Sequence, residues 1–404
     1  MSPFREALIE FRFTPEEEKF RREIREFLRA ELPADWGQVG GVGALGEGGE
    51  ARWEFLRQFQ KKLAAKGWLT LGWPAEHGGL GASHMMQVIY NEEMSYHRAP
   101  TQLGVGPDRV GPTIILYGSD EQKKQHLPGI AAADSVWCQG FSEPGSGSDL
   151  ASLQTRAVAD GDYFVINGQK IWTSLAHKAD WCILLARTDQ DAPKHKGISY
   201  FLLDMKTAGL AVRPLYDLTN RHTFNELFFE SVRVPRDCLV GELNRGWYIA
   251  AATLDFERSG INRVVAGIRI HEELVEYAAQ AGHNGGRIID SGGVRHKLAE
   301  LAIEFQAGRL LSYRVASMQA RGQIPNAEAS MSKLYGSELQ QRLAGAGMEI
   351  LGMGGQLGPG SRWTPMAGRL EQYYLFASAL TVAAGTSEIM RGIIAGRGLG
   401  LPRG

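Results

Sequence analysis

The chain has 404 residues, of which 44% are hydrophobic and 22% are charged, and its formal net charge is −1. This length and composition are typical of a globular protein with two or three domains, and the balanced charge argues against a nucleic-acid-binding protein, which would carry a basic face. No apolar run approaches the ~20 residues of a membrane-spanning helix, and the first residues have the features of neither a signal peptide nor a transit peptide.

The first segment, residues 1–130, has the pattern of a helical domain. Thr14 precedes Pro15, and Glu17 stands three residues after Thr14, which is the arrangement of a capping box with proline at the first helical position. Apolar residues then recur at helical spacing until Pro33, where we expect the helix to end.

A second helix in the same segment is predicted by "SDEQKKQHLP". Ser119 and Gln122 form its capping box, and Pro128 is expected to end it. Between the two predicted helices, residues 41–46 read "GVGALG" and match the spacing of a dinucleotide-binding turn. Such a turn must follow a strand, and the preceding "ELPADWGQVG" is not one, so we interpret this stretch as a glycine-rich loop.

Residues 131–240 have the pattern of an antiparallel β-domain. Asp160-Gly161 and Asn167-Gly168 are each typical of hairpin turns, and they lie among runs rich in β-branched and aromatic residues. The runs "WCILLA", "GISYFLLDM", "LAVRPLY" and "NELFFESVRVP" continue the pattern with no helix-length segment between them, which argues against βαβ units.

The remaining residues return to the helical period in two long amphipathic runs and a short last segment that begins at Thr386. The predicted fold class is therefore α+β and multidomain. It consists of an N-terminal helical domain over 1–130, a central antiparallel β-domain over 131–240 and a C-terminal helical bundle over 241–404.

The three cysteines, Cys138, Cys182 and Cys238, are too few and too scattered for a disulfide scaffold. No spacing of cysteine or histidine residues matches a metal site, so we predict no metal ion. Reduced thiols favour a cytoplasmic location.

Two stretches of the predicted β-domain have residues suited to a flat or phosphorylated ligand. In "WCQGFSEPGSGSDLAS", the glycines let main-chain N–H groups approach oxygen atoms, and Ser142 and Ser148 add donors. Further along, "NGQKIWTSLAHKADW" places Trp172 and Ser174 on the same side of a predicted strand. Each stretch also has a plainer interpretation, the first as a turn and the second as a strand whose aromatic residue packs on the sheet.

These motifs belong to a longer series that carries a family resemblance. The series, in chain order, is "WPAEHGGLG", "YGSDEQKKQHLPGI", "FSEPGSGSDLA", "NGQKIWTS", "NELFFESVRVP", "LDFERSG" and "AAGTSEIMR". On these motifs the chain resembles an acyl-CoA dehydrogenase over essentially its whole length. The helical–β–helical fold of that family agrees with the three segments predicted above.

The resemblance implies a bound FAD, an acyl-CoA substrate, an electron-transfer flavoprotein as the partner that receives electrons, and a homotetramer. The "SEPGSGSD"-like loop would contact the isoalloxazine and pyrophosphate, the "WTS"-like segment would lie beside the flavin ring and N5, and "GTSEI" would approach the nucleotide end. The residues carried over to the cofactor are Gln139, Phe141, Ser142, Gly147, Ser148, Trp172, Thr173, Ser174, Thr386 and Glu388.

The resemblance also implies a reaction in which a carboxylate removes the α-proton while the β-hydrogen leaves as a hydride to flavin N5. Many family members carry that glutamate directly before "GTS", where this chain has Ala384, which cannot accept a proton. Other members carry it on an earlier helix before an arginine, and this chain has Glu257 and Arg258 in "LDFERSG". We therefore predict Glu257 as the base and Arg258 as the residue that orients or tunes it, as in the subgroup with the glutamate on the earlier helix.

Two alternatives stay open. Many family members have an arginine and an aromatic-glycine pair that bind the FAD of a neighbouring subunit, whereas this chain has Gly282, Gly285 and Gly286, which predict a loose loop. This departure and Ala384 motivate a non-catalytic or partner-dependent subunit of a mixed tetramer. The same scaffold would also support an oxygen-using flavin oxidase or monooxygenase.

Overall fold

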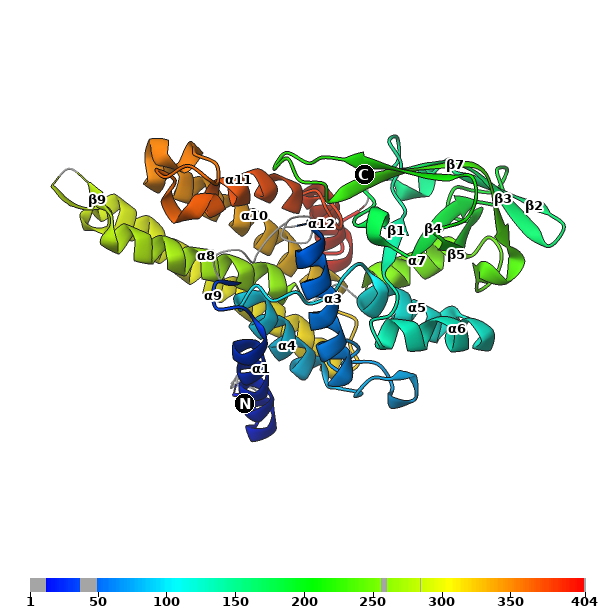
Figure 1. The fold of residues 1–404 in the computed structure, drawn as a ribbon, viewed down its shortest axis with the longest axis horizontal. Helices are drawn as coiled ribbons and strands as arrows, with labels where there is room; N and C mark the ends of the chain where they lie inside the picture. Colours follow the sequence, from blue (N-terminus) through cyan, green and yellow to red (C-terminus); the bar gives the residue numbers. More distant parts are fainter. Residues whose placement is uncertain (1–11, 37–48, 256–259, 284, 403–404) are drawn as a thin grey trace.

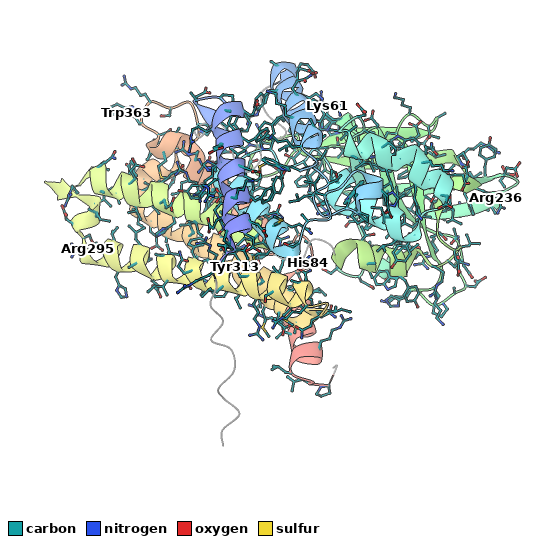
Figure 2. The ribbon with its side chains drawn as sticks, turned by 90° about the horizontal axis from the view of Figure 1, so that it is seen from below. Lys61, His84, Arg236, Arg295, Tyr313 and Trp363 are labelled. Carbon is teal, nitrogen blue, oxygen red and sulfur yellow. The ribbon has the colours of Figure 1, made fainter. Side chains whose placement is uncertain are left out.

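The structure is a computed structural model that describes residues 12–36, 49–255, 260–283 and 285–402. The chain begins with helices, continues through a sheet and returns to helices (Figure 1). The sheet (green) lies at one end of the elongated molecule and the longest helices extend to the other, with Arg236 and Arg295 near these two ends (Figure 2). This order confirms the predicted α+β fold class, while the domain boundaries at 130 and 240 stay predictions.

The helices of the N-terminal segment are α1 (Pro15–Glu31), α3 (Gly49–Ala65), α4 (His84–Tyr96), α5 (Gly111–Tyr117) and α6 (Asp120–Ala131). Both predicted capping boxes are present. At α1, the Glu17 N–H donates to Thr14 Oγ1 at 3.2 Å and the Thr14 N–H donates to the Glu17 carboxylate at 2.8 Å, and Ser119 and Gln122 form the same pair of bonds at α6. The last residue of α1 is Glu31, close to the end predicted from the proline that follows.

Pro128 does not end its helix, so that prediction is wrong: α6 continues to Ala131. A proline inside a helix removes the hydrogen bond to the carbonyl four residues earlier, here that of Lys124. Both residues lie on the exposed face, where water can bind the carbonyl instead. Leu127 and Ile130 are 2% and 1% exposed, and their burial holds the last turn against the core.

One sheet contains the strands β1 (Trp137–Gly140), β2 (Arg156–Asp160), β3 (Tyr163–Lys170), β4 (Trp181–Arg187), β5 (Ile198–Asp204), β6 (Leu210–Leu215), β7 (Phe224–Pro235) and β8 (Leu239–Val240). Their order is β6-β7-β3-β2-β4-β5-β8, and β1 pairs with β4. Most neighbours are antiparallel, as predicted, but β1 and β2 run parallel to β4. Nearly every side chain of β4 and β5 is buried, so both faces of this part of the sheet are covered.

The two predicted hairpin turns have different outcomes. Asp160 and Gly161 lie at the turn between β2 and β3, where Gly161 has a φ of 56°. Asn167 and Gly168 make no turn, because they lie inside β3 at a shift of its register on β7. Gly168 has a φ of 148°, and a Cβ there would lie 2.7 Å from Thr155 Cα, so a bulge and not a turn requires this glycine.

The C-terminal segment contains α7 (Gly246–Asp255), α8 (Ile261–Gln280), α9 (Gly292–Ala320), α10 (Asn326–Leu351), α11 (Arg369–Leu380) and α12 (Ser387–Ile393). Helices α8, α9 and α10 pack on one another around buried side chains such as Leu274, Phe305 and Leu339. The predicted loose loop is instead a short hairpin of β9 (Gly282–His283) and β10 (Gly286–Arg287), which projects beyond α8 (Figure 1). None of the helices in the described ranges is long and apolar enough to cross a membrane.

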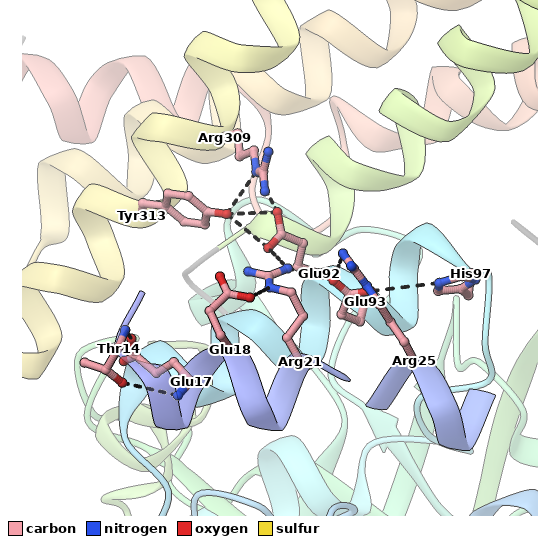
Figure 3. A network of polar contacts seen from close by, with 10 residues as sticks. All are labelled: Thr14, Glu17, Glu18, Arg21, Arg25, Glu92, Glu93, His97, Arg309 and Tyr313. Carbon is pink, nitrogen blue, oxygen red and sulfur yellow. Dashed lines mark hydrogen bonds and ion pairs between the residues drawn. The ribbon is translucent and has the colours of Figure 1, made fainter. Parts of the chain in front are cut away.

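A buried polar network joins the N-terminal helices to this bundle (Figure 3). Arg21 on α1 donates to Glu92 and Glu93 on α4 at 2.8 and 2.7 Å. Tyr313 on α9 donates to Glu92 at 2.9 Å. Burial alone would raise the pKa of Glu93, but hydrogen bonds from Arg25 and Arg21 outweigh it and lower the pKa. The Glu93 carboxylate is therefore charged, and the contacts of Glu92 and Glu93 hold three helices together.

Replacing Gly111 by alanine should destabilise the fold. Gly111 begins α5, and a Cβ there would overlap the indole ring of Trp73, which is 5% exposed. The Trp73 ring cannot easily move, because its N–H donates to the Pro107 carbonyl at 2.9 Å. We expect the free energy of unfolding, measured by urea denaturation, to fall by about 1–3 kcal/mol, the usual cost of overpacking.

The matched control is Gly345→Ala. Gly345 lies within α10, and its Cβ position has no atom within 4 Å. Alanine favours a helix over glycine, so this variant should be at least as stable as the parent. Equal stability of the Gly111→Ala and Gly345→Ala variants would contradict the steric argument.

Candidate functional site

Two segments of the β-domain are tied together at the end of β3. Lys170 Nζ donates to the Phe141 carbonyl at 2.9 Å and to the Glu143 carboxylate at 2.8 Å. The next residue, Ile171, donates its N–H to the Ser142 carbonyl at 2.9 Å. The loop that follows β1 and the segment that follows β3 are therefore held side by side.

The Lys170–Glu143 ion pair is almost fully buried, with side-chain exposures of 0% and 8%. Burial lowers the pKa of Lys170 to about 8, although Glu143 acts in the opposite direction. Burial would raise the pKa of Glu143, but Lys170 and the backbone N–H of Gln154 lower it below its usual value. Both groups are thus ionised near neutral pH. Glu143 also accepts from the N–H groups of Gln154 and Thr155 at 2.6 and 2.9 Å, which fixes the far end of the loop.

The segment after β3 presents Trp172 to solvent. The Trp172 side chain is 54% exposed, and its ring meets that of Phe224 edge-on with centroids 5.7 Å apart. The expected continuous strand is wrong, because β3 ends at Lys170 and Trp172 has a φ of 60°. Trp172 and Ser174 are nevertheless both exposed, and Thr173 between them is 0% exposed.

Gln139 and Phe141 lie at the start of the loop. Gln139, on β1, accepts from Arg109 Nη1 at 3.3 Å. Arg109 belongs to the π-helical turn Gly106–Val110, so the N-terminal helices reach the loop here. The ring of Phe141 is 3% exposed and packs edge-on against Tyr200, so this side chain belongs to the core.

The outer part of the loop contains Ser142, Gly147 and Ser148. Ser142 is half-buried, whereas Gly147 and Ser148 are exposed. Glu143 and Ser146 exchange backbone hydrogen bonds at 2.9 and 3.0 Å, which supports this turn from inside. A Cβ built on either glycine of the turn meets no atom within 4 Å, so the main chain here is open to a ligand.

Thr386 and Glu388 lie at the start of α12. Thr386 is the N-cap and accepts from the Ile389 N–H at 3.2 Å. Glu388 is exposed, and the pKa of its carboxyl is lowered by its own backbone N–H and by Thr386. An open cleft of about 630 Å³ lies beside them between α10 and α12. The lining residues are Glu338, Gln341, Arg342, Thr381, Val382, Thr386, Ser387, Glu388 and Arg391.

The structure does not bring all predicted site residues together. In the part of the chain that the structure describes, no hydrogen bond or ion pair links Thr386 or Glu388 to the loop after β1. Glu257 and Arg258 lie outside the described residues, between α7 and α8. Ala384 is exposed, has a φ of 54° and precedes α12.

The β-domain surface suits the flat cofactor that the resemblance implies. Trp172 offers an exposed ring, and Ser174 offers an exposed hydroxyl. Thr173 Oγ1 is buried without a hydrogen-bond partner among the described residues, and Ser387 Oγ beside the cleft is in the same condition. Buried hydroxyls are normally paired, and a bound cofactor would supply the partners that these two atoms lack. No cluster of side chains suited to a metal ion occurs within the described ranges.

A helical–β–helical chain with an open aromatic face beside a glycine-containing loop has the layout of a flavin-dependent acyl-CoA dehydrogenase. The sequence matches the three domain models of that family: the N-terminal domain over residues 14–134, the middle domain over 138–232 and the C-terminal domain over 244–399. The chain therefore belongs to the acyl-CoA dehydrogenase family, whose enzymes depend on FAD. The predicted family, enzyme class and cofactor are confirmed.

Individual proteins agree with this assignment. Acyl-CoA dehydrogenase IpdE1 of Mycobacterium tuberculosis is 38% identical over 389 residues, which cover 96% of this chain and 98% of that protein. The structure of the Tcur3481-Tcur3483 steroid ACAD matches with a TM-score of 0.87 and 36% identity, covering 97% of this chain and 99% of that one. The ChsE4-ChsE5 complex from Mycobacterium tuberculosis matches with a TM-score of 0.86 and 35% identity, covering 98% and 100%.

Three residues of the site were not found from the sequence. They are Lys170, Arg109 beside Gln139, and Asn225, whose Nδ2 donates to the Thr173 carbonyl at 3.0 Å. Lys170 and Asn225 are both fully buried strand residues. The sequence could have indicated them by a lysine or an asparagine at a strand position that faces the core. Charged and amide side chains are buried only where they have hydrogen-bond partners.

Lys170→Met should destabilise the β-domain and reduce the retention of FAD. The change leaves Glu143 buried without its countercharge, which typically costs about 3–5 kcal/mol. Adding Glu143→Gln to this variant should recover part of the loss, because it removes the uncompensated charge. Urea denaturation of both single variants and the double variant checks this, and flavin content after dialysis should follow stability.

The control for this cycle is Lys194→Met. Lys194 binds Asp149 at 2.8 Å, but both side chains are about half exposed, at 50% and 57%. Surface ion pairs contribute little, so this variant should differ from the parent much less than Lys170→Met does. If the two lysine variants lose the same stability, the Lys170–Glu143 pair does not hold the loop.

Proposed function

We propose that the chain catalyses the α,β-dehydrogenation of an acyl-CoA thioester and passes the electrons to an electron-transfer flavoprotein. The observation that carries this proposal is the family match over nearly the whole chain. When bound, the flavin supplies the redox chemistry, which is the acceptance of the β-hydrogen as a hydride at N5. The chain itself binds the cofactor, orients the thioester and removes the α-proton.

Glu257 is the proposed base. Ala384 has no group that can accept a proton, and Glu257 with Arg258 stands at the other sequence position where family members carry the base. A base must come within hydrogen-bond reach of the proton that it removes. Arg258 would keep the carboxylate ionised and orient it, because a neighbouring positive charge favours the charged form of an acid.

The proposed cofactor contacts fall into three groups. The loop after β1 would contribute Gln139, Ser142, Gly147, Ser148 and, because its ring is in the core, the main chain of Phe141. Trp172 would lie against the flavin ring, with Thr173 and Ser174 at its polar edge and N5. The unpaired Thr173 Oγ1 supports this second group. Thr386 and Glu388 would approach the nucleotide end.

The proposed substrate carries a branched or bulky acyl group. Ala383 and Ala384 are small and exposed, and they leave room where a glutamate would otherwise stand. A structural neighbour is described as a steroid ACAD, which is the kind of bulky substrate that such room would suit. A panel of acyl-CoAs in which short straight chains react best would contradict this proposal.

A second candidate is a partner-dependent subunit of a mixed tetramer. One structural neighbour is a complex of two named chains, ChsE4 and ChsE5, and this favours the candidate over the homotetramer that is usual in the family. For the location we propose the cytoplasm, since all three cysteines are free thiols.

Glu257→Gln should strongly slow reduction of the flavin by substrate. The variant keeps the shape of the side chain but removes the base, so we expect the rate of flavin reduction to fall by about 100- to 10,000-fold. The measurement is anaerobic bleaching of the flavin in the chain purified alone, with a mixed panel of acyl-CoAs. Glu300→Gln, on the exposed face of α9, is the control and should bleach like the parent.

Each other outcome of this titration has a defined meaning. Equal bleaching of the parent and Glu257→Gln would exclude Glu257 as the base. If neither bleaches, adding a partner chain should restore bleaching under the mixed-tetramer candidate. Rapid oxygen uptake after bleaching would indicate an oxidase and not a dehydrogenase.

A further inference from the structure

The backbone around Trp172 is a β-bulge. Lys170 faces Leu227 in the register of β3 on β7, whereas Thr173 and Asn225 exchange two backbone hydrogen bonds at 3.0 Å. The chain therefore advances three residues from Lys170 to Thr173 while the facing strand β7 advances only two, from Leu227 to Asn225. The extra residue is at position 171 or 172. Bulges change the direction in which a side chain points, and this bulge turns Trp172 toward solvent.

Trp172 is held in a conformation that it would not adopt by itself. Its φ of 60° lies in the left-handed region, which is strained for a bulky L-residue. Such strain persists only where the surrounding contacts impose it, and it is concentrated at functional sites. Two such contacts are the ring of Phe224 against the Trp172 ring and the backbone pairing of Thr173 with Asn225.

The side chain of Asn225 adds a third contact, and its orientation is fixed. Asn225 is 0% exposed, and its Nδ2 donates to the Thr173 carbonyl at 3.0 Å. Because a carbonyl can only accept, the amide nitrogen must face Thr173, and the amide oxygen must face the other way. On that side, His222 Nε2 lies 2.8 Å from Asn225 Oδ1, so His222 donates.

His177 completes the cluster and must be neutral. Its Nδ1 lies 3.2 Å from Asn225 Nδ2, which donates, so Nδ1 accepts and carries no proton. The rings of His177 and His222 are stacked with centroids 4.0 Å apart and an interplanar angle of 24°. A proton on His177 Nδ1 would therefore oppose the Asn225 amide at close range and add a charge beside His222.

The charged and titratable groups around the cluster favour the neutral form. Burial lowers the pKa of His177, and His222 and the adjacent Lys178, on the 3₁₀ turn Ala176–Lys178, lower it further. Tyr216, which directly follows β6, packs on His222 with ring centroids 5.6 Å apart. The carboxylate of Asp217, in the same loop, accepts a hydrogen bond from the Thr219 N–H at 2.8 Å.

We propose that His177, Asn225 and His222 form a positioning cluster that holds Trp172 and Ser174 ready for the flavin, and that protonation of His177 releases them. The identity of the ligand rests on the proposed function, whereas the cluster itself rests on the geometry above. None of the three residues is a catalytic residue, because they act through the Thr173 backbone.

The pH range follows from the sign of the pKa shift. The folded-state pKa of His177 lies below its ordinary value of 6.5. The neutral cluster is therefore complete above that value, and it is lost as the pH falls through the lower, folded-state pKa. Cofactor affinity should fall over the same range, while a cluster that only fills space would show no such change.

The test compares three variants of the full chain. His177→Asn keeps an acceptor near the position of Nδ1 but cannot titrate. Asn225→Leu removes both amide groups at nearly constant volume. His271→Asn is the control, since His271 is also buried, 8% exposed, but lies on α8 and bonds to the Leu298 carbonyl at 2.8 Å. FAD dissociation constants are measured by flavin fluorescence at about pH 8 and about pH 5.

We expect the parent and His271→Asn to bind FAD about tenfold more weakly at the lower pH, and His177→Asn to bind equally at both. Asn225→Leu should bind about tenfold more weakly than the parent even at the higher pH. If FAD affinity depends on pH in His177→Asn as it does in the parent, or if Asn225→Leu binds FAD as tightly as the parent, the proposed role of the cluster is wrong.

A second readout needs no cofactor. The fluorescence of Trp172, taken as the difference between each protein and its Trp172→Phe version, should shift on acidification in the parent and not in His177→Asn. A constant Trp172 signal in the parent would refute the release on protonation. Failure of every protein to bind FAD would instead contradict the proposed function, and the fluorescence would still decide whether the cluster acts.

Discussion

Lys170 brings an ammonium group into the interior of the β-domain, and the two segments proposed to bind the flavin meet around it. Its partners, the Phe141 carbonyl and the Glu143 carboxylate, lie on the loop after β1, while Lys170 itself ends β3. A buried charge is tolerated only with such partners, so loop and strand end cannot separate without exposing an unpaired ion. The relative placement of the loop and Trp172 depends on these contacts of Lys170 and on the adjacent backbone bond from Ile171 to Ser142.

The same region carries strain in addition to charge. The bulge at Trp172 follows immediately after Lys170, so an ion pair holds one side of the strained residue and the Asn225 pairing holds the other. A rigid support on both sides lets an exposed aromatic ring keep one position without a ligand. Preorganisation of this kind reduces the entropy lost when a cofactor binds.

Features that depend on neighbours in sequence could be predicted, and features that depend on distant partners could not. The capping box of Thr14 and Glu17 needs only the first turn of a helix, and its bonds are present. Asn167 and Gly168 have the sequence of a turn, but strand β7 pairs with β3 on both sides of them. The two residues therefore form a bulge inside β3 and not a turn. The carried-over site residues came from resemblance, whereas the roles of Lys170 and Asn225 arise from contacts with residues 27 and 52 positions away.

The start of α12 shows why alanine can stand where other family members have an acid. Lys333 Nζ donates to the Gly385 carbonyl, and Thr386 caps the helix, so the turn around Ala384 is held by groups other than its side chain. Glu388 already places a carboxylate near the helix N-terminus, where negative charge is favourable. A glutamate at 384 would therefore serve chemistry and not folding. Its absence leaves the fold intact, and under the proposed function the α-proton would be taken by a base from another helix or another chain.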